Sequence, residues 1–599
     1  MGYFKLERGA RQGDPISAYL FILVIEVFFQ MIRKNSGIKG LDICGHLFNI
    51  IAYADDATIL CRDLDSIKQL KATFDKFSKY SGLLLNSSKT EICGIGVKRG
   101  VDVALCGMKS VNLLTDSVKI LGIYFSYNEE IMRGKNFMRV ITKIERVLAV
   151  WRMRILTLAG KITVLKSLIF SKIVFIAFLS TVPETIVKCL IKLKNEFVWD
   201  NKPPKIKHTA MIGSYERGGL KDIDIESRIK ALRLSWVKRL YDDSDHEWKI
   251  IPNFYLEKYA KNIFNPNLKI KVNNNLPKFY KSVILLWEKV SVCEPITMEN
   301  VLVQPIRYNG RILVNRNVIT WKDAVDLYIQ NFYNENGDIL TWEEFKVKNM
   351  KGDNFHFKWR QIVDAIPREW KGKIASERLY GSPCSVVPEP HLQVISRRLP
   401  LSRLVGKEFY TILVNKIWEK PTSEAKIEEL LDITDLNWKK IYMLGRKITL
   451  DSYSRQFYFK LTHNVLFLNK ALHRMRLVES SMCSFCETTE ETVVHLFSEC
   501  QYVLGLWSRI QFFFVTKLSL PDLSPQSAIL GFQQLEDSQI LKNLILLIFK
   551  MVLYKDRESK SCSFERFLNK VKMIMKIEHA LCTNQDYNDL KWNPIRGLF

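Results

Sequence analysis

The chain has 599 residues, of which 47% are hydrophobic and 25% are charged. This length allows roughly three to five domains, and the composition excludes a collagen-like, coiled-coil or wholly disordered chain. The 89 lysine and arginine residues against 63 acidic residues give a net charge of +26, so the expected partner is a polyanion, either nucleic acid or an anionic membrane surface.

The amino-terminal sequence lacks the apolar stretch and the small-residue cleavage site of a secretory signal. The most apolar runs, Leu20 to Ile25 and Ile173 to Leu179, are shorter than the roughly 18 to 20 residues that cross a bilayer. Most of the 12 cysteines are widely separated, which is unlike a disulfide framework. These features predict an intracellular protein.

The first predicted element is a helix that begins at Asp14 and Pro15 and continues through spaced apolar residues to Val27. An aspartate can cap the free N–H groups of a helix start, and proline suits the first helical position. The tripeptide Arg11 to Gly13 stands immediately before this helix. Its first two side chains can reach phosphate or base, and its glycine lets the backbone approach a nucleotide closely.

Residues 47 to 60 form the next predicted element, two β-rich runs on either side of the pair Asp55 and Asp56. This pattern predicts a β-hairpin with two carboxylates at its turn. Mg²⁺ prefers hard oxygen ligands, usually carboxylates together with substrate phosphates, so the hairpin is a candidate metal site. The alternative interpretation of the acidic pair alone is an ordinary surface turn.

Two further blocks follow at residues 82 to 91 and 118 to 123. With these four blocks in this order and at this spacing, the sequence resembles the reverse transcriptases of non-LTR (LINE-type) retrotransposons. The resemblance implies an RNA-directed DNA polymerase that uses an RNA template, a DNA primer and deoxynucleoside triphosphates. It implies Mg²⁺ or Mn²⁺ bound by Asp55 and Asp56, and action in the nucleus as well as presence in the cytoplasm.

The resemblance also assigns roles to individual residues. Tyr53 would lay its ring against the primer end, and the alternative is a core aromatic residue. Lys89 matches a lysine proposed to protonate the pyrophosphate leaving group, although exposed lysines usually have no such role. The residues that would contact nucleotide and template are Arg11, Gln12 and Gly13. Those that match the primer-grip hairpin are Lys119, Leu121 and Gly122.

One catalytic group of the family has no match. The family takes a further aspartate from a strand well upstream of the Arg-Gln-Gly block, and two-metal chemistry needs it. The acidic residues before the hairpin that do not match it are Glu7, Asp14, Glu26 and Asp42. The sequence therefore predicts an amino-terminally truncated polymerase that does not polymerise alone, and it leaves the chain's status as an enzyme open. The alternative is a catalytically inactive nucleic-acid-binding remnant.

Residues 128 to 239 carry 23 basic and 10 acidic side chains, half of the net charge. Within them, Trp151 to Leu179 has apolar residues at helical spacing, which predicts a basic amphipathic helix or helix pair. For any single lysine, a solvated helix face is the simpler interpretation. The regional excess favours a phosphate-facing surface made of Arg152, Arg154, Lys161, Lys166 and Lys172.

Cys483, Cys486, His495 and Cys500 have the spacing C-x₂-C-x₈-H-x₄-C. Thiolates and imidazole at such spacings can close tetrahedrally around Zn²⁺ as a structural site, and the alternative is four unrelated buried residues. The flanking residues, Glu491-Thr492 among them, resemble the module downstream of the polymerase in LINE proteins. Its expected role is nucleic-acid binding or folding alone.

The whole sequence predicts an α+β fold in five segments. These are a partial palm at 1–127, a basic helical thumb-like region at 128–240, a connection of uncertain structure at 241–445, a CCHC zinc-binding module at 446–515 and a helical carboxy-terminal tail at 516–599. The expected cofactors are Mg²⁺ or Mn²⁺ at the palm and Zn²⁺ at the module. No membrane is expected as a partner, and the sequence does not say whether a partner chain exists.

Overall fold

The computed structural model describes residues 14–98, 107–242, 244–256, 264–265, 267–268, 276–290, 298–376, 389–532, 537–560 and 562–599. The chain divides into two compact units, each assembled from separate segments. Unit 1 consists of residues 1–144, 173–182 and 229–409, and unit 2 consists of residues 145–172, 183–228 and 410–599. The five-segment division remains a prediction.

The described part of the chain is mostly helical. Its α-helices are α1 Ser17–Lys34, α2 Leu64–Ser81, α3 Glu129–Arg133, α4 Arg139–Arg152, α5 Leu158–Val164, α6 Ser171–Leu179, α7 Glu184–Trp199, α8 His208–Met211, α9 Ile225–Tyr241, α10 Ile250–Leu256, α11 Lys278–Trp287, α12 Met298–Leu302, α13 Trp342–Asn349, α14 His356–Ala365, α15 Arg368–Ser376, α16 Gly406–Ile417, α17 Ser423–Leu431, α18 Trp438–Ile448, α19 Ser452–Thr462, α20 Asn469–Arg474, α21 Gln501–Phe514, α22 Pro525–Leu530, α23 Asp537–Asp556, α24 Phe564–Leu581 and α25 Gln585–Arg596.

The described strands all lie in unit 1 and pair only as two-stranded sheets. Five pairs are antiparallel, and β5 with β6 is parallel. The strands are β1 Leu41–Ile43, β2 His46–Phe48, β3 Ile50–Tyr53, β4 Asp56–Ile59, β5 Glu91–Ile92, β6 Lys109–Ser110, β7 Val118–Ile120, β8 Ile123–Phe125, β9 Leu313–Val314, β10 Asn317–Val318, β11 His391–Val394 and β12 Arg397–Pro400. Helices with small sheets agree with the predicted α+β class.

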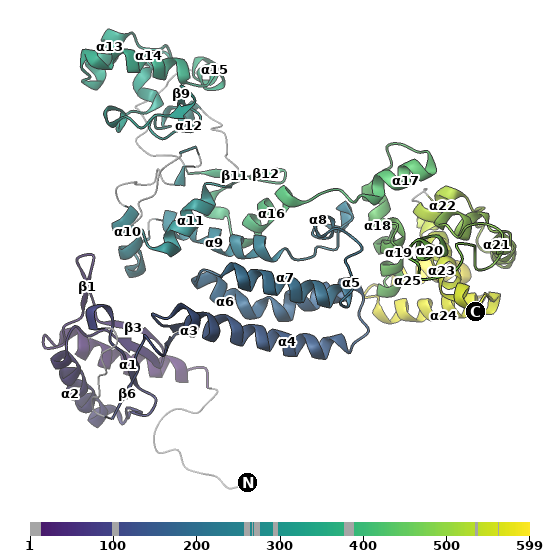
Figure 1. The fold of residues 1–599 in the computed structure, drawn as a ribbon, viewed down its shortest axis with the longest axis horizontal. Coiled ribbons are helices and arrows are strands. Elements are labelled where there is room, and N and C mark those ends of the chain that lie inside the picture. The colour runs from purple at the N-terminus through teal and green to yellow at the C-terminus, as the bar shows by residue number, and fades with distance from the viewer. Residues whose placement is uncertain are drawn as a thin grey trace, which may run out of the picture. The chain divides into compact units, whose positions relative to one another are not determined.

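The amino-terminal part of unit 1 has a small core between two helices and a hairpin (Figure 1). Phe28 and Ile32 of α1 are buried with Phe77 of α2, and the outer strand ends of the β3–β4 hairpin pack against them. Asp63 caps α2 by accepting the Ser66 N–H at 2.8 Å. Much of the apolar surface of α1 remains exposed: Tyr19, Leu20, Ile22, Leu23, Val24 and Val27.

Unit 2 has a much larger core around α23. This helix is apolar on all sides, with nine of its residues from Leu541 to Leu553 buried hydrophobics, as is typical of a helix enclosed by others. It contacts α18, α19, α24 and α25. Figure 1 shows these helices gathered at the green-to-yellow end of the chain. The core therefore joins helices of the predicted zinc module to those of the predicted tail.

Residues 298 to 374 form a further core of their own in unit 1, in the part of the chain for which the sequence shows no motif. Its largest fully buried side chains are Phe332, Phe345 and Trp370. Among the described residues, no single helix is long and apolar enough to cross a membrane, and one bent pair, Leu158–Ile169 with Ser171–Leu179, passes that test by length and composition alone.

Candidate active-site hairpin and metal centre

The acidic pair lies at the end of the predicted hairpin. In β3 and β4, Ile50 pairs with Ile59 and Tyr53 pairs with Asp56, so Ala54 and Asp55 form the turn. Ala54 adopts a left-handed conformation with φ of 51°, which the tight reversal of the chain requires. The hairpin prediction for residues 47–60 is confirmed, although the strands are shorter than that range.

The two ends of this hairpin have different environments. Ile50 and Ile59 pack against the core of α1 and α2, which fixes the base of the hairpin. Asp55 and Asp56 are both exposed at the other end. Tyr53 is 76% exposed as a residue, so the alternative of a core aromatic residue is wrong. The hairpin thus presents two carboxylates and an aromatic ring to solvent, and carboxylates of this kind fit a hard cation such as Mg²⁺.

The helix that follows the Arg-Gln-Gly block is confirmed as α1, but its first turn differs from the prediction. The helix begins at Ser17, and the Asp14 side chain accepts the Ile16 N–H at 3.0 Å from before the helix rather than capping it directly. Arg11, Gln12 and Gly13 lie outside the described residues, so their contact with nucleotide and template remains a prediction.

The predicted primer-grip residues form a second hairpin, β7 with β8. Leu121 and Gly122 make its two-residue turn, with φ of 46° and 90°, the left-handed values of the tightest hairpin loops. Lys119 is exposed on β7, and Lys89 is exposed in the turn after α2. Among the described residues, no hydrogen bond or ion pair joins Lys89 or this second hairpin to Asp55 or Asp56, and the roles of these residues remain predictions.

The four CCHC residues converge in unit 2. Their ligand atoms all lie within 4.8 Å of one another. The Sγ atoms of Cys483 and Cys500 are 4.0 Å apart, and Cys486 Sγ lies 3.3 Å from His495 Nε2. A tetrahedral Zn²⁺ site with Zn–S bonds of about 2.3 Å places two sulfurs about 3.8 Å apart. The observed spacing therefore fits a four-ligand zinc site, and the alternative of four unrelated residues is wrong.

The backbone holds the two halves of this cluster in place. The Cys483 N–H donates to Thr489 O at 2.7 Å and the Glu487 N–H donates to Cys483 O at 3.0 Å, which forms a tight knuckle around Cys486. His495 and Cys500 lie at the ends of one π-helical turn, His495–Glu499, immediately before α21. The Cys483 thiol donates to Cys500 and lowers the pKa of that thiol to about 7, which favours the thiolate that binds metals.

A buried ion pair supports the knuckle from behind. Glu491 is fully buried, and its Oε2 accepts both the backbone N–H and the hydroxyl of Ser484, at 2.9 and 2.7 Å. Its Oε1 accepts from the guanidinium of Arg557 at 2.8 Å and from the Asn469 N–H at 2.9 Å. From the sequence, Glu491 was identified only as a residue that flanks the CCHC motif. Its pairing with Arg557 was missed, because no local pattern relates the two residues.

The basic surface predicted in unit 2 is partly internal. Lys161 is only 7% exposed, and its ammonium pairs with Asp200 at 2.6 Å, so it does not lie on a phosphate-facing surface. Lys194 and Asp222 form a pair at 2.9 Å in which both side chains are buried. Pairing explains both, because an uncompensated charge inside a protein is strongly unfavourable. Arg152 and Arg154 are exposed, and so are Lys166 and Lys172.

Comparison with known proteins gives matches in both regions. Residues 2–125 match the family described as reverse transcriptase (RNA-dependent DNA polymerase), and residues 415–507 match the family described as zinc-binding in reverse transcriptase. The chain is 23% identical over 620 aligned positions to the transposon TX1 uncharacterized 149 kDa protein of Xenopus laevis, across 92% of this chain and 45% of that protein.

A second relative matches over a shorter range. It is the retrovirus-related Pol polyprotein from type-1 retrotransposable element R2 of Popillia japonica, 29% identical over 96 residues, which are 16% of this chain and 13% of that protein. The chain thus spans less than half the length of either relative.

Proposed function

We propose that this chain, which belongs to the reverse transcriptases of non-LTR retrotransposons, takes part in RNA-templated DNA synthesis with the β3–β4 hairpin as a metal-binding part of the active site. The observation that carries the proposal is the exposed pair Asp55 and Asp56 at the end of a hairpin inside the region matched to reverse transcriptases. If the hairpin were a surface turn without function, its position inside the region matched to reverse transcriptases would be unexplained.

The chemistry of the hairpin suits nucleotidyl transfer. Bound Mg²⁺ or Mn²⁺ would supply the positive charge that stabilises the transferring phosphate and the leaving pyrophosphate. Asp55 and Asp56 would hold these ions, and the exposed ring of Tyr53 would position the primer end. Arg11, Gln12 and Gly13 would orient the nucleotide and template, Lys89 would donate a proton to the leaving group, and Lys119, Leu121 and Gly122 would hold the primer.

The rest of the chain would grip the nucleic acid. We assign the palm to residues 1–127 and a thumb-like role to residues 128–240, and we assign Zn²⁺ to the CCHC cluster within 446–515. The substrates would be an RNA template, a DNA primer and deoxynucleoside triphosphates, inside the cell. The net charge of +26 supports a nucleic-acid partner.

A second candidate function is nucleic-acid binding without catalysis. It is favoured by one observation: the CCHC cluster and the core around α23 lie in unit 2, and the acidic hairpin lies in unit 1 with a separate core. A chain built this way can bind through unit 2 whether or not the hairpin acts. Both candidate functions require nucleic-acid binding, and both therefore predict an affinity for RNA that falls steeply as the salt concentration rises.

Primer extension on an RNA template tests the first function. The purified chain is compared with Asp55→Asn and with a matched control, Asp65→Asn, which changes an exposed carboxylate on α2. Extension with Mg²⁺ or Mn²⁺ that disappears only in Asp55→Asn would support the hairpin as the metal site, and it would contradict the prediction that the chain does not polymerise alone. Extension that survives Asp55→Asn would contradict the assignment of the hairpin. No extension by any of the three proteins, with salt-sensitive RNA binding retained, is the outcome predicted for an incomplete polymerase fragment. Adding a segment that carries the family's upstream aspartate then separates the two functions, because extension that requires Asp55 would support the first and its continued absence would favour the second.

A further inference from the structure

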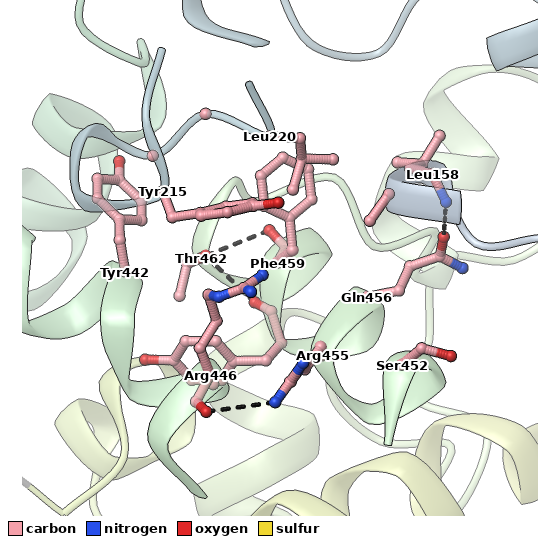
Figure 2. Close-up of a pocket in the computed structure, with 15 residues that line it drawn as sticks. Leu158, Tyr215, Leu220, Tyr442, Arg446, Ser452, Arg455, Gln456, Phe459 and Thr462 are labelled. Atoms are coloured by element: carbon pink, nitrogen blue, oxygen red, sulfur yellow. Dashed lines mark hydrogen bonds between the residues drawn. The ribbon is translucent and has the colours of Figure 1, made fainter. Parts of the chain in front are cut away.

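A pocket in unit 2 is lined by residues that belong to neither metal-ligand site. Three segments that are distant in the sequence meet there: the start of α5, the loop after the short helix Tyr215–Arg217, and the helices α18 and α19 (Figure 2). The cavity has a volume of about 110 Å³. Neither the family matches nor the sequence motifs assign it a ligand.

Close backbone packing shapes this pocket. Gly218 has φ of 76°, and a Cβ there would lie 2.6 Å from the ring of Tyr442 on α18. A Cβ on Gly445 would lie 2.6 Å from the ring of Tyr458 on α19. Only glycine allows these approaches, so the loop packs directly on α18, and α18 packs directly on α19. The pocket is therefore a built feature of the fold rather than a gap between loosely packed elements.

Two arginines give the pocket its charge. The Arg446 guanidinium lies 3.8 Å from the centre of the Tyr215 ring, and Figure 2 shows it beneath that ring. Arg455 donates from Nε to Thr449 O at 2.7 Å. In the part of the chain that the structure describes, neither arginine has a carboxylate within ion-pair distance. Burial lowers the pKa of Arg455 and so does the nearby charge of Arg446, while the carboxylates of Glu578 and Asp451 act in the opposite direction.

The remaining walls are mostly apolar. Leu158, Leu220 and Phe459 line the cavity, and Gln456 accepts the Leu158 N–H at 2.6 Å on one side. Stacking on Tyr215 occupies a face of the Arg446 guanidinium and leaves its N–H edge for an anion. A ligand that matches both the arginine N–H groups and the apolar walls has an anionic group joined to a flat, largely apolar ring, as a nucleotide has.

Further cations lie outside the pocket in the same unit. Lys460 follows Phe459 on α19, and burial together with the charges of Lys460 and Lys202 lowers the pKa of Lys205. Lysines that repel one another in this way favour a ligand with several negative charges rather than a single anion. A base that enters a concave apolar pocket must also be unpaired, because a base in a duplex is stacked and hydrogen-bonded.

We propose that this pocket holds one unpaired nucleotide of a single strand, with its phosphate on Arg446 and Arg455 and its base against Leu158, Leu220 and Phe459. The strand continues past Lys460 and Lys205. This site is distinct from the acidic hairpin and from the CCHC cluster, and it binds without taking part in nucleotidyl transfer. It rests on the nucleic-acid binding proposed for unit 2 and adds the pocket and the kind of strand that it binds, and a chain that lacks polymerase activity would still use it.

Fluorescence anisotropy with the whole chain and a labelled single-stranded RNA of about 12 nucleotides tests the proposal. Arg446→Ala is compared with Lys447→Ala, which removes a neighbouring exposed cation of α18 that does not line the pocket. We expect Arg446→Ala to weaken binding about tenfold and Lys447→Ala less than about twofold. Equal effects of the two variants would overturn the proposal, because they would indicate diffuse attraction only.

A second variant covers the case in which Arg446→Ala disturbs the fold. Ser452 is exposed at the start of α19, where an acidic residue is favourable for the helix, and it lines the pocket beside Arg455. Ser452→Glu should weaken single-strand binding and leave the thermal midpoint unchanged. Full binding by Ser452→Glu would overturn the proposal.

Three competitors separate the possible sources of the nucleotide. We expect an unlabelled single strand to displace the probe, and a blunt RNA duplex or free uridine triphosphate to do so far less well. Displacement by the free nucleotide alone, or equal displacement by the duplex, would overturn the proposal. Asp65→Asn, which changes the exposed carboxylate on α2, should bind the single strand as the unchanged chain does. Because this assay measures binding and not extension, a failure here is distinguishable from a failure of the polymerase assignment.

Discussion

The acidic hairpin of unit 1 and the CCHC cluster of unit 2 are both candidate metal sites, but their surroundings are opposite. Asp55 and Asp56 are exposed on a hairpin whose core has five buried residues. Cys483 and Cys500 are almost fully buried, inside a core that includes residues of α17 to α19 and α21 to α25. A second layer of buried polar groups, Glu491 with Arg557, supports the cysteine site, and no such layer is described around the hairpin carboxylates.

This difference follows from what each metal would do. A metal that acts on a phosphate chain needs open coordination positions and room for the polymer, so its protein ligands must be reachable. A structural zinc has all four positions taken by protein, and its binding energy becomes folding energy. Substitutions at the hairpin should therefore change activity with little change in stability, and substitutions at the cluster should do the reverse.

The largest effect is expected at the cluster itself. Cys500→Ser removes a fully buried ligand, and we expect it to destabilise unit 2 by more than about 4 kcal/mol, because the lost metal no longer offsets the unfolding of the knuckle. Hydrogen exchange of the α21 and α23 amides measures this loss locally. A strong chelator added to the unchanged chain should have the same effect.

The matched variant is Asp55→Asn in the hairpin. In this variant, the hydrogen-exchange protection of the amides of the hairpin and of α1 should not change. If chelation leaves the α21 and α23 amides as protected as before, the cluster holds no metal that matters for folding, and the contrast between the two regions fails.

A smaller effect is expected from the charged layer behind the knuckle. Arg557→Ala leaves the fully buried Glu491 without its cation, and such a loss costs about 3 to 5 kcal/mol. The comparison variant is Arg33→Ala, which breaks a pair with Glu26 of similar length, 2.6 Å, between side chains that are 48% and 44% exposed. An exposed pair of this kind contributes little. Urea denaturation of both variants should show a clear shift only for Arg557→Ala, and equal shifts would contradict the argument.

Features carried by local sequence could be predicted. The β-rich runs around Asp55 and Asp56 predicted their hairpin, because alternation and turn chemistry are properties of neighbouring residues. The spacing of Cys483, Cys486, His495 and Cys500 predicted their convergence for the same reason. The basic stretch from Trp151 to Leu179 was predicted as one helix or a pair. The pair is confirmed as Leu158–Ile169 with Ser171–Leu179. The first residues of the stretch differ, because α4 ends at Arg152 and the pair begins after Thr157, which caps it through the Gly160 N–H at 3.1 Å.

Features that depend on distant residues could not be predicted. Arg557 lies 66 positions after Glu491, and no periodicity relates them. The nucleotide pocket joins Leu158 to Gln456 across 298 positions. Lys161 looked like a surface cation until the fold placed Asp200 beside it. Charge and composition describe a segment, but whether a charged side chain faces water or an ion-pair partner is decided by tertiary packing.

The smallest expected effect concerns a lysine inside the unit 2 core. Lys550 of α23 is 2% exposed, donates to Ser527 O at 2.6 Å, and has no carboxylate within ion-pair distance among the described residues. Burial lowers its pKa to about 7, against about 10.4 in an unfolded chain. Between these two values the unfolded chain holds more protons, so the free energy of unfolding rises with pH there. Below pH 7 the lysine is charged in both states, and the penalty for the buried charge is fully present.

Lys550→Met should therefore stabilise unit 2 at pH 6 by about 1 to 4 kcal/mol, and by less at pH 9 because the lysine is then mostly neutral in the folded chain. Exchange of the α23 amides at the two pH values, corrected for the intrinsic rate, measures the difference. Lys76→Met, at an exposed position on α2, should leave the stability of unit 1 and its pH dependence unchanged. A gain that is the same at pH 6 and pH 9 would mean that better packing, rather than the buried charge, stabilises the variant. The contrast between unit 2 and the hairpin would then rest on how tightly the side chains pack, and not on the cost of a buried charge.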